Sequence, residues 1–211
     1  MRRFLALVMA ALFLPLVLPC GSGPAHAATP KTVLVLGDSL SAAHNIAAGQ
    51  GWVHLLEVRL AEMEPGWRAI NASISGETSL SGRNRLPGLL AKYRPAVVVL
   101  ELGANDGLRG LPLPALRDNL GAMVDAAQKA GARVLLLGIE LPVNYGPQYR
   151  DGLRAVYAEL AREKRTALVP FLLQGVALDP SRMQDDGLHP NAAGEPAVLD
   201  TVWAALHPLL R

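Results

Sequence analysis

The fold is decided by the stretch Thr32-Val33-Leu34-Val35-Leu36-Gly37-Asp38-Ser39-Leu40-Ser41, in which an apolar run leads into Gly-Asp-Ser. The run is continuous rather than alternating, which is typical of a strand buried on both faces of a parallel sheet. Gly-Asp-Ser predicts a tight turn where that strand ends. Open α/β sheets bind ligands at the carboxyl ends of their strands, so Ser39 is a candidate nucleophile. The tripeptide alone is also ordinary turn composition, and the assignment therefore depends on partners elsewhere in the chain.

Further short apolar runs follow, and segments with helical spacing separate them. Trp52, Leu56 and Leu60, for example, recur with the period of a helix. Strands that alternate with helices form a parallel sheet covered on both faces, and right-handed crossovers leave few topologies. We therefore predict an α/β fold with three layers, built on a doubly wound five-stranded parallel sheet of flavodoxin-like order. The predicted strands are 32–36, 69–72, 96–102, 133–139 and 167–171.

The ends of the helical segments are marked by proline and glycine. The first helix begins near Trp52 and ends near Pro65-Gly66. A helix-rich segment after residue 81 is interrupted by Pro87 and ends near residues 93–95, and residues 103–107 are predicted to form a loop. The remaining helices are predicted over residues 114–130, 148–164 and about 193–206.

Residues 1–27 have the features of a secretory signal peptide. Two arginines open the chain, the apolar run 4–18 is too short for a comfortable membrane span, and Ala25-His26-Ala27 supplies a small-x-small cleavage pattern. We therefore predict a signal peptide over 1–27, one domain over 28–211 and a secreted or periplasmic location. Lipidation of Cys20 is the alternative, and Pro19 directly before the cysteine fits that pattern poorly.

The charge and cysteine content narrow the possible partners. The full chain carries a formal net charge of +2, and removal of the predicted signal peptide takes away two arginines and no acid. The mature chain then has a formal net charge of zero, so no excess positive charge is left to attract nucleic acid. The cysteine also lies in the signal peptide, so the mature protein has neither a disulfide nor a thiol nucleophile. We expect a monomer, no nucleic-acid partner and at most transient contact with a membrane surface.

Polar residues of chemical interest lie in the loops that follow the predicted strands. Because the carboxyl ends of parallel strands meet at one edge of the sheet, these loops are expected to converge. Convergence of separate loops supports a site more strongly than any one residue does. The residues are Ser39 after the first strand, Gly76 after the second, Asn105 after the third, and Asp186 and His189 after the fifth.

A serine hydroxyl is a weak nucleophile unless a base activates it. His189 is the preferred base, because Pro190 directly after it and Gly187 on its N-terminal side indicate a held, irregular loop. His44 is the rival, although no acid is evidently placed to orient its ring. Asp186 precedes His189 by three residues, which allows one irregular turn to bring the carboxylate to the imidazole Nδ1. Asp185 is the alternative orienting acid.

Attack on an acyl carbonyl creates an oxyanion, which needs donors that are already in place. The N–H of Gly76 is a candidate, because a missing side chain permits close approach and unusual backbone angles. The side-chain amide of Asn105 and the N–H of Ser39 are the other candidates. Taken alone, Gly76 is also consistent with a simple turn and Asn105 with a turn cap.

Several blocks of the chain together form a family pattern. They are Gly37-Asp38-Ser39-Leu40-Ser41, Asn71-Ala72-Ser73-Ile74-Ser75-Gly76-Glu77-Thr78, Glu101-Leu102-Gly103-Ala104-Asn105-Asp106-Gly107-Leu108-Arg109-Gly110 and Met183-Gln184-Asp185-Asp186-Gly187-Leu188-His189-Pro190-Asn191. In these blocks the chain resembles the SGNH hydrolases of the GDSL family. The segment Leu141-Pro142-Val143-Asn144-Tyr145-Gly146 is similar to the acyl-site loop of that family, and the resemblance spans essentially all of the mature chain.

The resemblance implies a role for each of the reacting groups. Ser39 would be the nucleophile, His189 its base and Asp186 the acid that orients the base. This assignment favours them over the two rivals, His44 and Asp185. It also implies a flavodoxin-like fold with a shallow, open site.

The resemblance further implies an oxyanion hole made by Gly76, Asn105 and the N–H of Ser39. Two departures from the family pattern stand near the expected acyl site. Ala43-His44 occupies a place where Gly-Tyr is expected, and Ala104 stands where glycine is common. These departures bear on substrate preference rather than on the chemistry.

These features predict a serine esterase that hydrolyses ester and thioester bonds of acyl substrates through a Ser-His-Asp triad, of the thioesterase, lysophospholipase or arylesterase type. Neither a metal nor another cofactor is needed for this chemistry. The alternatives are a carbohydrate O-acetyl esterase and a non-catalytic module that binds lipid or glycan. Apolar side chains in the bordering loops suit an acyl chain, and they are Leu108, Leu141 and Pro142, together with Leu111 and Leu113.

Overall fold

The computed structural model describes residues 29–211, and these form an α/β domain around one parallel sheet. The strand order is β2-β1-β3-β4-β5, and every neighbouring pair is parallel. The predicted five-stranded, flavodoxin-like sheet is therefore confirmed. The predicted signal peptide and Cys20 lie outside the described residues. The strands are β1 (Lys31–Gly37), β2 (Trp67–Asn71), β3 (Val97–Glu101), β4 (Arg133–Leu137) and β5 (Ala167–Val169).

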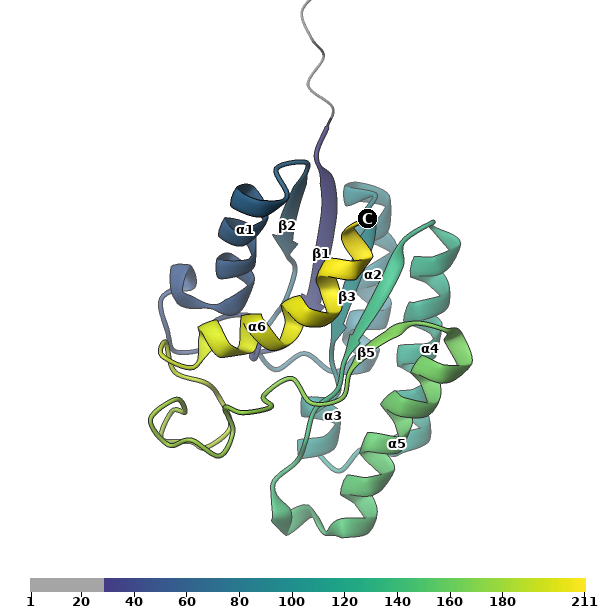
Figure 1. The fold of residues 1–211 in the computed structure, drawn as a ribbon. Helices are drawn as coiled ribbons and strands as arrows, with labels where there is room; N and C mark the ends of the chain where they lie inside the picture. Colours follow the sequence, from purple (N-terminus) through teal and green to yellow (C-terminus); the bar gives the residue numbers. More distant parts are fainter. Residues whose placement is uncertain (1–28) are drawn as a thin grey trace, which may run out of the picture.

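Helices cover both faces of the sheet and complete the three layers (Figure 1). On one face lie α1 (Trp52–Met63) and α6 (Glu195–Leu206). On the other lie α2 (Ser79–Tyr93), α4 (Leu113–Lys129) and α5 (Pro147–Lys164). Within residues 29–211, none of the helices combines the length and apolar character that a membrane crossing requires. The shorter helices are α3 (Ala104–Leu108), η1 (Ala48–Gln50), η2 (Val143–Tyr145) and η3 (His207–Leu210).

The core lies where the continuous apolar runs predict it. The side chains of residues 33–36 in β1 and 97–100 in β3 are fully buried. Strand β1 pairs with β2 along one edge and with β3 along the other, and the helical layers cover both faces of the sheet above and below its apolar run (Figure 1). Burial of one such valine or leucine side chain stabilises the fold by roughly 1.5–3 kcal/mol. The central strands therefore provide a rigid base for the loops at their carboxyl ends.

Two local predictions are wrong. Pro87 does not interrupt the second helical segment, because α2 continues through it from Ser79 to Tyr93. Both Pro87 and Arg83, whose carbonyl loses its helical partner, are exposed, so water can replace the missing hydrogen bond. Residues 103–107 are not a plain loop either: Gly103, with φ at 127°, leads into the short helix α3. Asn105 is thus carried by a helical turn rather than by irregular backbone.

Glu195 connects the two helices on one face of the sheet. Its side chain is 2% exposed and accepts the N–H of Trp52, the first residue of α1, at 2.8 Å. Burial raises the pKa of Glu195 to about 7, although the hydrogen bond from Trp52 opposes this change. At alkaline pH the folded protein therefore carries a buried carboxylate.

Replacing Glu195 with glutamine should stabilise the protein at about pH 8 by on the order of 1–3 kcal/mol. The native state binds the proton more tightly than the unfolded state, so wild-type stability falls as pH rises from about 4.5 through about 7. Glutamine keeps an oxygen for the Trp52 N–H and removes the charge. Urea unfolding should show the gain at about pH 8 and little difference at about pH 4. An equal gain at both pH values would contradict this account.

Candidate active site

Ser39 lies in the tight turn that ends β1. The N–H of Leu40 donates to Asp38 Oδ1 at 3.1 Å, and the N–H of Ala42 donates to the Asp38 carbonyl at 3.0 Å. Asp38 is fully buried, whereas Ser39 is only partly buried. The turn therefore anchors one acidic side chain inside the protein and presents the next residue at the carboxyl edge of the sheet.

The structure brings His189 and Asp186 to Ser39 from the loop between β5 and α6. His189 Nε2 lies 2.8 Å from Ser39 Oγ, and His189 Nδ1 lies 2.6 Å from Asp186 Oδ2. An ionised carboxylate only accepts hydrogen bonds, so Nδ1 carries the proton and Nε2 accepts from the Ser39 hydroxyl. The three groups form one continuous chain of hydrogen bonds, although Ser39 and His189 are 150 residues apart in sequence.

The loop that carries this acid and base is shaped by Asp186 itself. Asp186 Oδ1 accepts the N–H of Leu188 at 2.9 Å and that of His189 at 3.0 Å. Gly187 has φ at 65°, a conformation that favours glycine. The N–H of Gln184 donates to the His189 carbonyl at 2.8 Å and holds the other side of the loop. The three-residue spacing thus lets one oxygen of Asp186 hold the backbone while the other contacts the ring.

Hydrogen bonds also set the charge of Asp186. Burial raises its pKa, but the N–H of Leu188 and both the ring and the N–H of His189 outweigh burial and lower the pKa below its ordinary value. Asp186 is therefore ionised at neutral pH. A carboxylate in this position stabilises the positive charge that the imidazole acquires when it takes a proton.

The rival residues lie beside this hydrogen-bonded chain. The ring of His44 packs against that of His189, with centroids 4.5 Å apart and an interplanar angle of 41°. Gln184 Nε2 donates to the carbonyl of His44 and to that of Pro190, each at 2.8 Å, and so ties the two loops together. The side chain of Asp185 is exposed. This geometry agrees with the preference for His189 and Asp186.

Asn105 lines the same pocket as Ser39 and His189. Its Nδ2 donates to Asp38 Oδ2 and to the carbonyl of Glu77, both at 3.1 Å. These contacts fix the amide plane beside the nucleophile turn. They also engage both N–H groups of the amide, so an oxyanion would have to share one of them.

Gly76 lies in the loop after β2. Its φ is 81°, and its carbonyl accepts a hydrogen bond from Arg109 at 3.1 Å. The N–H of Ile74 donates to the carbonyl of Gly37 at 3.0 Å, which seats this loop on the end of β1. Gly76 is therefore at the expected edge of the sheet, although the described residues that line the pocket beside Ser39 do not include it. Its oxyanion role stays a prediction.

A pocket of about 100 Å³ opens beside Ser39. Ala104, one of the departures from the family pattern, forms part of its wall. Leu111 and Leu113 do not line it: Leu111 is 38% exposed, and Leu113 lies close to Gly152. The expected acyl-site residues Leu108, Leu141 and Pro142 do line it, and the wall is extended by Leu40, Ile139, Phe171, Leu173 and Leu188.

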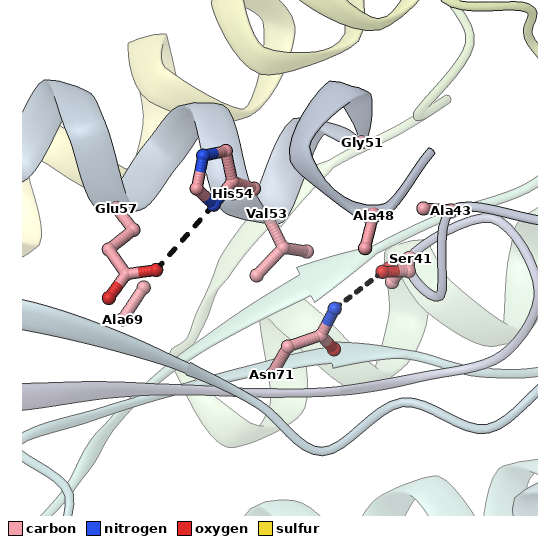
Figure 2. Close-up of a pocket in the computed structure, with 9 residues that line it drawn as sticks. All are labelled: Ser41, Ala43, Ala48, Gly51, Val53, His54, Glu57, Ala69 and Asn71. Atoms are coloured by element: carbon pink, nitrogen blue, oxygen red, sulfur yellow. Dashed lines mark hydrogen bonds and ion pairs between the residues drawn. The ribbon is translucent and has the colours of Figure 1, made fainter. Parts of the chain in front are cut away.

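A larger cavity of about 190 Å³ lies between α1 and the segment that follows Ser39 (Figure 2). His54 Nδ1 lies 3.8 Å from Glu57 Oε2 on one side of it, and both side chains are about half exposed. On the other side, Asn71 Nδ2 donates to the carbonyl of Ser41 at 2.8 Å (Figure 2). Because Ser39 and His189 line the smaller pocket instead, we place the chemistry there.

Sequence reasoning missed two buried acids next to Ser39. The side chains of Asp38 and Glu101 are both fully buried. Strand register places Gly37 directly opposite Glu101, and a Cβ on Gly37 would lie 2.6 Å from Glu101 Oε2. Glycine is therefore required at the end of β1 if the Glu101 carboxyl is to fit. The one sequence signal was a charged residue inside the apolar run of the third strand.

Open, doubly wound α/β sheets bind their ligands at the carboxyl ends of the strands, which is where the pocket beside Ser39 lies. Residues 35–196 match the model of the GDSL-like lipase/acylhydrolase family. The chain belongs to this family, and the resemblance found in its sequence blocks is confirmed.

Its relatives are enzymes of known class. The chain is 52% identical over 183 residues to esterase TesA of Pseudomonas aeruginosa, which covers 87% of this chain and 91% of that protein. It is 41% identical over 185 residues to thioesterase 1/protease 1/lysophospholipase L1 of Escherichia coli strain K12, which covers 88% of each. The crystal structure of psychrotrophic esterase EstA from Pseudoalteromonas sp., inhibited by monoethylphosphonate, is similar with a TM-score of 0.81 and 39% identity, and the match covers 85% of this chain and 98% of that one. The predicted enzyme class, a hydrolase, is confirmed.

Proposed function

We propose that this chain is a serine esterase that hydrolyses carboxylic ester and thioester bonds of acyl substrates, with Ser39 as nucleophile, His189 as base and Asp186 as orienting acid. One observation carries the proposal: an unbroken chain of hydrogen bonds runs from Asp186 through His189 to the Ser39 hydroxyl, at the mouth of a mainly apolar pocket. The names of the relatives, an esterase and a thioesterase/lysophospholipase, agree with it.

The first half of the proposed cycle transfers the acyl group to the enzyme. Ser39 Oγ forms a bond to the carbonyl carbon while His189 Nε2 takes the hydroxyl proton, and the carbonyl electron pair moves onto its oxygen. Asp186 stabilises the imidazolium. When the carbonyl re-forms, the bond to the leaving group breaks, and His189 returns its proton to the departing alcohol or thiol.

The second half releases the acid. His189 takes a proton from water, whose oxygen attacks the carbonyl of the acyl-serine. Collapse of the second tetrahedral intermediate breaks the bond to Ser39 Oγ, which regains its proton from the imidazole. In both halves the oxyanion forms beside the N–H of Ser39 and the amide of Asn105, and donors of this kind typically contribute about 10²–10³-fold to turnover.

The pocket favours an apolar acyl group. A cavity of about 100 Å³ is smaller than the roughly 300–1,000 Å³ of pockets that enclose drug-sized ligands. Only the part of a long acyl chain next to the carbonyl would be enclosed, and the remainder would extend over the open rim. Export through the predicted signal peptide would place the enzyme among external esters and lysophospholipids rather than among cytoplasmic acyl thioesters.

The test is a hydrolysis panel with the purified mature chain. It compares nitrophenyl esters of increasing acyl length, an acyl-CoA, a lysophospholipid and an acetylated xylooligosaccharide. We expect kcat/KM to rise from the acetyl ester to esters of medium chain length, because each additional buried methylene contributes about 0.8 kcal/mol while the pocket can enclose it. Activity confined to the acetylated sugar would instead identify a carbohydrate O-acetyl esterase.

A further inference from the structure

The buried acids next to the nucleophile share a polar network. Glu101 Oε2 accepts the N–H of Asp38 at 3.1 Å and the hydroxyl of Ser41 at 2.8 Å. Asp38 accepts the N–H of Leu40 on one oxygen and the amide of Asn105 on the other, each at 3.1 Å. Among residues 29–211, no lysine or arginine forms an ion pair with either carboxyl group. Two buried carboxylates without a cation cannot both be ionised at modest cost.

One of the two carboxyl groups must therefore carry a proton, and the second oxygen of Glu101 indicates where that proton lies. Glu101 Oε1 is buried and receives no hydrogen bond from any donor among the described residues. Asp38 and Glu101 are neighbours, because Glu101 Oε2 accepts the N–H of Asp38 and the residue before Asp38 lies opposite Glu101 in the sheet. A proton on Oε1 turns this oxygen from an unsatisfied acceptor into a donor to Asp38, which satisfies both groups.

We propose that Glu101 is a positioning residue that stays neutral at the working pH and donates its carboxyl proton to Asp38, so that the ionised Asp38 holds the nucleophile turn and the Asn105 amide in place. The inference rests on the proposed function, because it assigns these contacts to the same site. Asp38 then accepts three hydrogen bonds, from Glu101, Leu40 and Asn105. The bond from Leu40 closes the nucleophile turn itself, whereas those from Glu101 and Asn105 link that turn to β3 and to α3.

The electrostatics of the pair agree with this arrangement. Burial raises the pKa of Asp38 to about 6, against hydrogen bonds from Leu40 and Asn105 that lower it. Burial, followed by the nearby negative charge of Asp38, raises the pKa of Glu101 well above its ordinary value. The pair therefore loses its first proton mainly from Asp38 and keeps the second on Glu101 in neutral solution.

The test compares Glu101→Gln with Asp38→Asn in the mature chain. Glutamine reproduces a neutral acid, since its oxygen accepts from Asp38 N–H and Ser41 while its amide donates to Asp38. We expect Glu101→Gln to keep kcat within about 3-fold of wild type. Asparagine at position 38 presents an amide to donors, so we expect kcat to fall on the order of 10²-fold with little change in KM. A Glu101→Gln variant as impaired as Asp38→Asn, with its fold intact by circular dichroism, would overturn the proposal.

A double-mutant cycle separates positioning from general destabilisation. If Asp38 acts by holding the amide, then Asp38→Asn combined with Asn105→Ala should be about as slow as Asn105→Ala alone, which we expect to lose about 10²–10³-fold in kcat. Losses that multiply would contradict the proposal. Glu195→Gln is the matched control, because it neutralises a buried acid outside this network and should leave kcat unchanged.

The protonation of Glu101 can be read without any assay of activity. In protein labelled with carbon-13 at the glutamate carboxyl, the Glu101 signal is the one missing from Glu101→Gln. We expect it to stay at the position of a protonated acid between about pH 5 and about pH 8. A signal at the carboxylate position would refute the inference even if the variants behaved as expected. Failure of the proposed function is recognised separately, because Ser39→Ala would then retain hydrolysis.

Discussion

Ser39→Ala should abolish hydrolysis of every substrate in the panel while leaving the fold intact. Without the hydroxyl no acyl-enzyme forms, and a reduction of about 10⁴-fold or more in kcat is expected for the loss of a serine nucleophile. The Ser39 hydroxyl contacts the imidazole of His189 and sits at a partly buried surface, so its removal leaves no buried donor or acceptor unpaired. Initial rates on a nitrophenyl ester, together with thermal unfolding, measure both halves of this expectation.

Covalent labelling identifies the nucleophile independently of turnover. The related esterase EstA was crystallised with monoethylphosphonate as its inhibitor. A nitrophenyl phosphonate ester should therefore transfer one phosphonyl group to Ser39 Oγ of the wild-type chain, with release of nitrophenol, and none to Ser39→Ala, as seen by peptide mass spectrometry. Ser181→Ala is the matched control, because its hydroxyl contacts Asp179 on the exposed surface. Retained turnover in Ser39→Ala, or a label on another residue, would show that the nucleophile is misassigned.

Asp186→Asn should lower kcat by about 10³–10⁴-fold with a smaller effect on KM. The asparagine oxygen can still accept the N–H groups of Leu188 and His189, so the loop should keep its shape. Its amide, however, is a donor facing His189 Nδ1. The ring would then carry its proton on Nε2 and could no longer accept the hydroxyl proton of Ser39.

The neighbouring acid provides the control for this variant. Asp185→Asn makes the same chemical change one residue earlier, on an exposed side chain. We expect its kcat to stay within about 2-fold of wild type. If Asp185→Asn were the slower of the two, the orienting acid would be Asp185, the alternative that the sequence left open.

The architecture was predictable because apolar runs alternate with segments of helical spacing along the chain. Four of the five strands are mainly apolar runs, and right-handed crossovers leave few orders for five parallel strands, of which the observed flavodoxin-like order is one. The edges of the elements were less clear. Strand β5 ends at Val169 rather than at residue 171, because Pro170 has no N–H to continue the ladder. Pro87 is tolerated inside α2 because solvent reaches the carbonyl of Arg83, which loses its helical hydrogen bond. That exposure is a property of the folded structure and cannot be read from the local sequence.

The candidate reacting residues could be proposed from the sequence for a different reason. Ser39, Asp186 and His189 stand in loops, where a polar residue needs no partner in the core, so their chemistry is visible in the sequence. Glu101 was missed because it ends a buried strand, and its contact with Asp38 depends on the register of β1 against β3. The apolar residues of β1 and β3 are continuous rather than alternating, so the sequence pattern does not specify the register of one strand against the other.

The separation of Ser39 from His189 has a consequence for biosynthesis. The serine lies in the turn that follows the first strand, and the imidazole lies in the loop between β5 and α6. A chain made from its N-terminus has the serine long before it has the histidine. If Ser39 and His189 have the proposed roles, a polypeptide or fragment that lacks the loop of His189 holds a serine without its base, and ester hydrolysis begins only after that loop has been made.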